Sequence, residues 1–146
     1  MNALAIIAAL VGVLAAGVIY GTDVFCALVQ RPALAQLDDV TMTAAMGRVH
    51  QYGDRRLPAP GVIGILAAVT ATAAAAGIAL IALLTWLGLY LRVAAPINRA
   101  LTAAAIAHVT PGNARALQLR WDSIITARAL LMAAAVAGLA ASAATH

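Results

Sequence analysis

Two charged side chains, Asp23 and Arg128, lie inside long stretches of sequence that are otherwise apolar. An ionised side chain in hydrocarbon is costly, so such a residue faces water or pairs with an opposite charge. Asp23 comes seven residues before Gln30, at the end of the first apolar stretch, and Arg128 comes eight residues after Arg120. Both therefore lie about 10 Å deep along a helix axis. We predict a buried Asp23–Arg128 pair with a catalytic role, the alternative being a pair that only holds helices together.

Aromatic side chains are spaced to surround this pair. Trp86 and Tyr90 are one helical turn apart, Trp121 precedes the arginine by seven residues, and Tyr20 precedes the aspartate by three. Residues at such spacings share one face of a helix. We predict that the four rings line a pocket for an apolar substrate. The alternative is that Tyr90 and Trp121 only anchor the protein at the membrane surface, where aromatic residues are enriched.

His50 and Asp54 are four residues apart, which places them on one face of a helix. A carboxylate that orients an imidazole is a common arrangement for a general base, and it also suits the outer shell of a metal site. We predict a functional His50 with Asp54 as its orienting partner and with either His50 or Asp23 as the proton acceptor, the alternative for His50 being a solvated histidine at the membrane surface. His108 lies in a second polar loop, where a solvated histidine is the simpler interpretation. Haem or metal held by His50 and His108 stays an alternative without a diagnostic ligand spacing.

The composition is that of a membrane protein. Of the 146 residues, 64% are hydrophobic and 10% are charged, and the mean hydropathy is +0.97. A soluble domain has apolar residues at about half of its positions and charges at about a quarter. We therefore predict an all-α integral membrane protein, with one membrane domain over residues 1–146 and the lipid bilayer as its surroundings.

The same inventory argues against several classes of function. The arginines are scattered between apolar stretches, so the chain has no soluble basic face for nucleic acid. The single cysteine, Cys26, excludes an intrachain disulfide. The sequence has no glycine-rich phosphate loop, no G-x-S-x-G and no H-E-x-x-H. Nucleotide binding and serine hydrolase chemistry therefore have no support.

The apolar stretches predict a bundle of four transmembrane helices. Each span needs about 20 residues, and the charge-free sequence 61–91 is too long for one helix, whereas 57–95 holds two. We place the turn between them near Thr72–Gly77, with Gly77 supplying a permissive backbone. The first stretch has no basic residue before Arg31, so we interpret it as a retained anchor rather than a signal peptide. The predicted spans are 3–29, 57–75, 77–95 and 121–144.

The arginines also predict the orientation of the bundle. With four spans, the loop between spans one and two and the loop between spans three and four share one side of the membrane. These loops contain Arg31, Arg48, Arg55, Arg56, Arg92, Arg99 and Arg115. Basic loops are retained in the cytoplasm. We predict cytoplasmic loops, both termini outside, and a bacterial inner membrane.

The first basic loop predicts a further helix. Asp38 or Asp39 can cap a helix over residues 39–52, in which Met42 and Met46 fall on one face. Such an amphipathic helix lies along the membrane surface. We therefore predict a short interfacial helix between the first two spans.

Prolines and glycines predict details of the helices. Pro96 predicts a kink or a restart of the third helix, because the residue before proline disfavours helical geometry. Thr110 and Pro111 predict the cap and the first position of the last helix. Gly17 and Gly21 form a G-x-x-x-G pattern, which predicts close packing of helices within the bundle.

Three stretches resemble the small four-span membrane proteins grouped with fungal anthrone oxygenases, many of whose bacterial members have no assigned function. They are GTDVFCALVQRPAL, RVAAPINRAL and LRWDSIITARAL. The second is similar to the family's proline-x-asparagine signature, and the third to its tryptophan and arginine at the start of the last span. The likeness covers most of the chain with short motifs. Between that tryptophan and arginine the family often has asparagine, where this chain has Ile125 with Thr126 beside it.

The resemblance implies oxidation of a flat, activated aromatic at carbon by dioxygen, with no dedicated cofactor motif. It carries functional roles to Pro96, Asn98, Trp121 and Arg128. An anthrone-like substrate has an acidic C–H, so a base produces an enolate that a fixed positive charge stabilises. The predicted catalytic residues are His50, Asp23 and Arg128. The predicted substrate-binding residues are Tyr20, Trp86, Tyr90, Asn98 and Trp121, with Asp54 as the orienting residue.

Two other classes of function stay open at this point. A small proton-coupled transporter or binding protein would use Asp23 as its protonatable site, and a four-span chain would have to oligomerise to enclose a path. A redox carrier would hold haem or metal on His50 and His108. The expected partners are lipid and a hydrophobic small molecule, without nucleic acid, and a homo-oligomer is not decided by the sequence.

Overall fold

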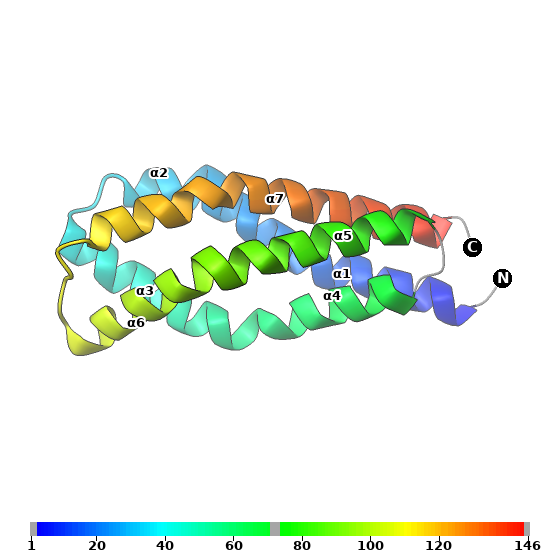
Figure 1. The fold of residues 1–146 in the computed structure, drawn as a ribbon, viewed down its shortest axis with the longest axis horizontal. Coiled ribbons are helices and arrows are strands. Elements are labelled where there is room, and N and C mark those ends of the chain that lie inside the picture. The colour runs from blue at the N-terminus through cyan, green and yellow to red at the C-terminus, as the bar shows by residue number, and fades with distance from the viewer. Residues whose placement is uncertain (1–2, 71–73, 145–146) are drawn as a thin grey trace.

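The computed structural model describes residues 3–70 and 74–144, and every regular element within these ranges is helical (Figure 1). In chain order the elements are α1 (Ala3–Phe25), η1 (Cys26–Gln30), α2 (Arg31–Leu34), α3 (Asp39–Arg56), α4 (Pro58–Thr70), α5 (Ala74–Leu89), η2 (Tyr90–Ala94), α6 (Ala95–Ala107) and α7 (Ala114–Ala144). The helices run along one long axis, and α1 begins at the end of the bundle where α7 finishes. The predicted all-α bundle is confirmed.

Three helices in the described part of the chain are long and apolar enough to cross a membrane: Ala3–Leu34, Ala75–Ala107 and Ala114–Ala144. The second predicted span appears as the shorter apolar helix α4, of 13 residues. The predicted turn falls partly on residues 71–73, outside the described ranges, but Gly77 lies within α5 and does not form it. The helices Ala75–Ala107 and Ala114–Ala144 correspond to the third and fourth predicted spans, 77–95 and 121–144. They extend beyond these spans because the neighbouring polar residues continue each helix.

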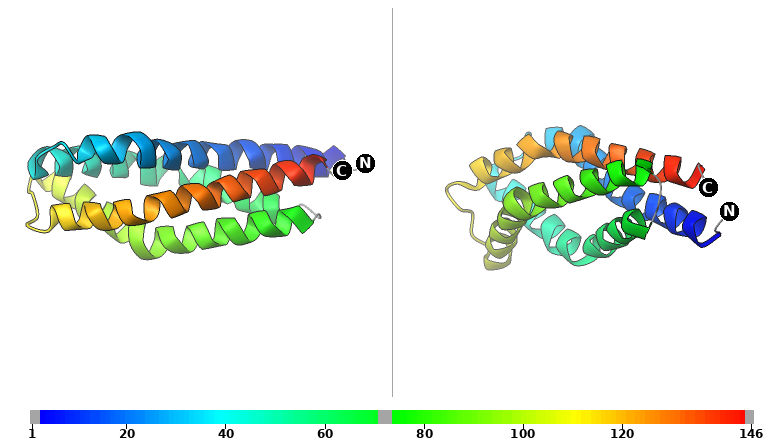
Figure 2. Two further views of the ribbon diagram at one scale, coloured as in Figure 1. Left: turned by 90° about the horizontal axis from the view of Figure 1, so that it is seen from above. Right: turned by 45° about the vertical axis from the view of Figure 1, so that its right-hand side comes forward.

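Helix α7 is the central element of the bundle. It packs against α1 on one side and α5 on the other, and Figure 2 shows it running between them. Helix α1 also packs against α4, and α3 packs against α6. The bundle therefore has two halves along its axis. Helices α4 and α5 complete the half near the chain ends, and α3 and α6 complete the other half.

Two prolines each follow a π-helical segment. Pro32 follows η1, where the N–H of Arg31 donates to the carbonyl of Cys26, and Pro96 follows η2, where Ala95 donates to Tyr90. Proline has no N–H and its ring crowds the preceding turn, so the hydrogen-bond ladder widens by one residue there. The predicted disturbance at Pro96 is therefore a π-helical segment within a continuous helix. Each widened turn rotates the side chains that precede the proline.

The loop after α2 is held by charged side chains. Asp38 is the cap of α3, since its carboxylate accepts hydrogen bonds from the backbone N–H and the hydroxyl of Thr41. These bonds hold the pKa of the Asp38 carboxyl below its usual range. Asp39 instead pairs with Arg115, whose guanidinium also donates to the carbonyl oxygens of Leu34 and Leu37. Arg115 thereby ties the start of α7 to the loop.

The last helix begins later than its proline predicts. Helix α7 starts at Ala114, and Pro111 lies in the preceding turn, where its carbonyl oxygen accepts the N–H of Ala114. Thr110 and Pro111 are therefore not the cap and first position of α7. The chain leaves α6 at His108, which adopts a left-handed conformation with φ of 54°.

Close helix contacts occur at glycines other than the predicted pair. A Cβ at Gly17 or Gly21 would meet nothing within 4 Å. A Cβ at Gly47 would instead overlap the backbone of Leu101 and the side chain of Ala105. Gly47 thus lets α3 pack directly on α6, and the apolar face of α3 with Met42 and Met46 is buried there. The predicted G-x-x-x-G packing is wrong, because those glycines face outward from the bundle.

Two hydrophobic cores lie one after the other along the bundle. One packs the alanines of α1, α4, α5 and α7 around Leu83, Met132 and Leu139. The other packs the π-helical segment η1, α3, α6 and the start of α7 around Met42 and Leu101. Buried polar side chains collect where the two cores meet, and this junction positions the candidate site.

Candidate functional site

A cavity of about 190 Å³ lies at the junction of the two cores. All four passes of the chain along the bundle line it, through α1 and η1, α3 and α4, α5 and η2 with α6, and α7. Its walls are mainly apolar, from residues such as Ile19, Leu57 and Ile65. A mainly apolar cavity with a few convergent polar groups is the usual form of a small-molecule site.

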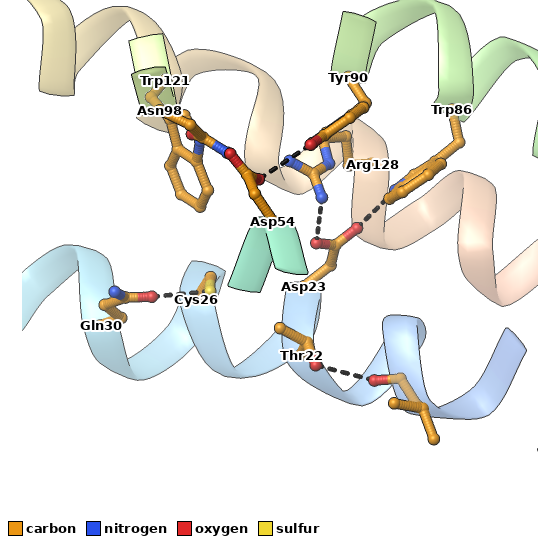
Figure 3. Close-up of polar contacts among 11 residues, drawn as sticks. Thr22, Asp23, Cys26, Gln30, Asp54, Trp86, Tyr90, Asn98, Trp121 and Arg128 are labelled. Carbon is orange, nitrogen blue, oxygen red and sulfur yellow. Dashed lines mark hydrogen bonds and ion pairs between the residues drawn. The ribbon is translucent and has the colours of Figure 1, made fainter. Parts of the chain in front are cut away.

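The predicted ion pair forms at this cavity. Arg128 donates from Nη2 to Oδ1 of Asp23 at 2.8 Å, and Trp86 donates from its indole Nε1 to Oδ2 at 2.7 Å (Figure 3). Both oxygens of the carboxylate are therefore hydrogen-bonded. The side chains of Asp23 and Arg128 are buried. Buried charges are retained only when they are paired and hydrogen-bonded in this way.

Aromatic rings surround the guanidinium of Arg128. Its central carbon lies 4.9 Å from the ring centroid of Trp86, 5.7 Å from that of Trp121 and 6.0 Å from that of Tyr90. Trp86 and Tyr90 stack nearly parallel, with centroids 5.7 Å apart. Distances of up to about 6 Å allow cation–π attraction. The Nε of Arg128 has no hydrogen-bond partner among the described residues, so one donor of the guanidinium is free.

Asp54 organises a second network, and it differs from the predicted one. Its Oδ1 accepts hydrogen bonds from the hydroxyl of Tyr90 and from Nδ2 of Asn98, both at 2.8 Å. Asn98 in turn accepts the indole N–H of Trp121 at 3.0 Å. Figure 3 shows both donors converging on the carboxylate. The predicted orientation of His50 by Asp54 is wrong, because the Asp54 carboxylate bonds to Tyr90 and Asn98 and makes no hydrogen bond to the imidazole.

His50 lines the cavity with a neutral imidazole. Its side chain is only 4% exposed, and its ring centroid lies 5.4 Å from that of Trp121. Burial lowers the pKa of His50 to about 4; the charge of Arg128 adds to this and that of Asp54 opposes it. The Nε2 atom has no hydrogen-bond partner among the described residues. A neutral, unpartnered ring nitrogen is available to take a proton or to bond to a ligand.

A chain of polar and sulfur atoms on the cavity wall was not predicted. Cys26 donates from Sγ to Oε1 of Gln30 at 2.7 Å, and Gln30 donates from Nε2 to Sδ of Met46 at 3.0 Å. All three residues line the cavity. Cys26 and Gln30 belong to η1, whose widened turn precedes Pro32. Pro32, two residues after Gln30 at the end of the first apolar stretch, is the sequence signal that locates this part of the site.

Three residues with a functional role predicted from the sequence, Tyr20, Pro96 and His108, do not line the cavity. Tyr20 is 37% exposed and does not line it, because its position on α1 faces outward while Asp23 faces the bundle interior. His108 is exposed at the end of α6, so it does not share a site with His50. Within residues 3–70 and 74–144, no group of three or more His, Cys, Asp or Glu could hold a metal ion.

The remaining predicted residues lie together around the cavity, and their catalytic and binding roles stay predictions. The lining includes Asp23, His50, Asp54, Trp86, Tyr90, Asn98, Trp121 and Arg128. They come from six different elements. Comparisons of the chain with protein-family models, with curated proteins and with solved structures found no match. The function must therefore be argued from the geometry of this cavity.

Proposed function

We propose that the protein is a membrane-embedded oxidoreductase that oxidises a hydrophobic aromatic substrate, of the anthrone-like kind, with dioxygen. The observation that supports this most is the combination of a neutral, unpartnered His50 and a fixed Arg128 in one apolar cavity. A base beside a positive charge suits the removal of a proton from carbon next to a carbonyl group. The aromatic walls suit a flat substrate.

The residues divide the proposed reaction between them. Nε2 of His50 takes the proton from the acidic C–H, and Arg128 stabilises the oxygen of the resulting enolate. The electron-rich enolate passes electrons to dioxygen, and the new C–O bond gives a hydroperoxide after protonation. Loss of water from the hydroperoxide leaves a second carbonyl. One oxygen atom of dioxygen ends in the product and the other in water.

Asp23 and Asp54 act on other residues in this proposal. Asp23 fixes Arg128 and Trp86 through one hydrogen bond to each carboxylate oxygen. Asp54 fixes Tyr90 and Asn98. Preorganised charges of this kind need no rearrangement when the enolate forms. The transporter alternative has less support, since both oxygens of Asp23 are already engaged by donors from other helices.

We also propose the orientation of the protein in the membrane. Exposed arginines occur on α2, α3, η2 and α6, at the half of the bundle away from the chain ends. The positive-inside rule places this half on the cytoplasmic side of a bacterial inner membrane, with both chain ends outside. The cavity then lies in the cytoplasmic leaflet, within reach of a substrate dissolved in lipid.

Oxygen consumption by the purified protein in nanodiscs tests the proposed activity. We expect uptake with anthrone as substrate, in a ratio of one dioxygen to one anthrone, with anthraquinone as product. His50→Asn removes the base, and a lost general base typically costs about 10²- to 10⁴-fold in rate. Uptake by the native protein no faster than by empty nanodiscs would refute the proposal for this substrate.

His108→Asn is the matched control for His50→Asn. His108 is exposed and has a positive φ, which asparagine adopts readily, so the substitution leaves the backbone unstrained. We expect the rate of the His108→Asn protein to stay within about twofold of the native rate. Equal losses in the two variants would show that His50 has no specific role.

A further inference from the structure

We infer that the cavity takes its ligand from the hydrocarbon layer, through an opening between α1 and the α3–α4 connection. The ligand is an amphiphile with one oxygen-bearing ring inside the cavity and an apolar extension in the opening. The inference rests on the proposed function, because it uses the same cavity and the same polar groups. It adds the class of ligand, its direction of approach and its orientation.

The exposed lining residues locate the opening. Val49 of α3 is 50% exposed, Val62 of α4 is 56% exposed, and Pro58 between them is also exposed. Across the opening, α1 presents Thr22, whose hydroxyl donates to the carbonyl of Val18 in its own helix. The rim is therefore apolar, with its one hydroxyl already satisfied. Such a rim favours a ligand that arrives from lipid over one that arrives from water.

Glycines and small residues close the other end of the opening. A Cβ at Gly12 would lie 2.6 Å from the side chain of Ala67, so α1 and α4 are in close contact there. About two turns nearer the cavity, a Cβ at Gly61 would lie 3.4 Å from Ile19. The two helices thus stay in contact up to the edge of the cavity, which Ile19 and Gly61 line. The opening faces sideways from the bundle and does not follow its axis.

The size of the cavity limits what enters. An apolar cavity of about 150 Å³ holds a benzene molecule. The cavity here, at about 190 Å³, encloses one substituted ring, and any further rings or chain must extend into the opening. The apolar extension then contacts the apolar side chains of Val49 and Val62 at the rim of the opening.

The unpartnered polar atoms orient the ring. His50 and Arg128 are each more than nine-tenths buried, and Nε2 of the first and Nε of the second lack partners among the described residues. A hydroxyl group on the ring of the ligand hydrogen-bonds to Nε2 of His50, and an oxygen atom attached to that ring accepts a hydrogen bond from Nε of Arg128. A buried polar atom without a partner is costly, so a ligand that satisfies both is favoured over a hydrocarbon of the same shape.

The chain carries its own reporter of binding. It has two tryptophans, Trp86 and Trp121, and both line the cavity. Their emission, excited at the red edge of the indole band where phenols do not absorb, follows occupancy directly. The probes are 4-nonylphenol and nonylbenzene, added to the full chain in nanodiscs. The two share ring and tail and differ only in the hydroxyl.

We expect 4-nonylphenol to change the emission saturably and nonylbenzene to bind about tenfold more weakly, as the loss of a buried hydrogen bond requires. The Gly61→Leu substitution fills the opening, so it should weaken the binding of 4-nonylphenol by about tenfold. The Gly77→Leu substitution lies on an open face of α5 and should leave this binding unchanged. Thermal unfolding of both variants shows whether they fold.

Three outcomes would overturn the inference: no saturable change, equal binding of the two probes, or native-like binding by a folded Gly61→Leu protein. If that variant does not fold, the comparison of probes on the native chain still decides. Binding is read without turnover, so saturable, hydroxyl-dependent binding without oxygen uptake would refute the proposed enzyme activity and leave this inference standing.

Discussion

Removal of Arg128 should destabilise the bundle far more than removal of an exposed charge. In an Arg128→Met protein, Asp23 keeps its hydrogen bond from Trp86 but loses its counter-charge. Leaving one partner of a buried ion pair uncompensated costs about 3–5 kcal/mol. Methionine fills a similar volume, so the loss reflects charge more than packing. The three cation–π contacts of the guanidinium are lost as well.

A double-mutant cycle separates these contributions. Asp23→Asn keeps an oxygen that accepts the indole N–H of Trp86 but removes the negative charge. Combined with Arg128→Met, it leaves no unpaired charge in the interior. The loss of cation–π contacts occurs in both the single Arg128 variant and the double variant, so it cancels from the cycle. We expect the two substitutions to be coupled by about 2 kcal/mol, within the range for residues in direct contact.

The exposed pair Asp39–Arg115 is the natural comparison. Its N–O distance of 2.8 Å equals that of the buried pair, but its side chains are 52% and 31% exposed. Asp39→Asn should therefore cost at most about 1 kcal/mol. Unfolding in mixed detergent micelles, followed by tryptophan emission, compares the native protein with the Arg128→Met, Asp23→Asn, double and Asp39→Asn variants. An Arg128→Met protein no less stable than Asp39→Asn would refute the account of the site as a buried, paired charge.

Three further predictions concern the pH response, the helix contacts and the cysteine. Because the pKa of His50 falls from 6.5 to about 4 on folding, only the unfolded chain gains a proton between these values. Stability should drop by about 3 kcal/mol as the pH falls through this window, and His50→Asn should abolish that drop in acid unfolding curves. Gly47→Ala should destabilise by about 1–3 kcal/mol, because its Cβ meets Leu101 of α6. Gly77→Ala should stabilise slightly, and thermal unfolding compares the two. Alkylation of Cys26 by N-ethylmaleimide, followed by mass spectrometry, should slow about tenfold when 4-nonylphenol fills the cavity. Equal alkylation rates would contradict the placement of the ligand.

Much of the site was predictable from single residues in the sequence. Asp23 and Arg128 were paired by their depth in two apolar stretches, and Trp86, Tyr90 and Trp121 were placed around them by helical spacing. These inferences hold because the bilayer permits few options for an ionised side chain. Tyr20 shows the limit of spacing arguments. A helix face is wide, and a residue three positions from a buried one still reaches the outer surface.

The hydrogen-bond partners were not predictable in the same way. Asp54 was expected to orient His50, which lies four residues away on the same helix. In the structure the Asp54 carboxylate instead accepts hydrogen bonds from Tyr90 and Asn98, which are more than thirty residues away in the sequence. Local spacing identifies residues that face the same direction. Only the packing of α3 against the η2–α6 segment determines which donors reach the carboxylate.

The sequence by itself determined the class of the protein and the order of its helices. An apolar, weakly charged chain must satisfy its backbone internally, and helices do so within each segment. Tertiary structure decided where the helices touch. Close packing at Gly47 rather than at Gly17 and Gly21 depends on which faces meet, and composition does not encode that. The cavity is likewise a property of the assembled helices, because its lining comes from all four passes of the chain where the two packed cores meet.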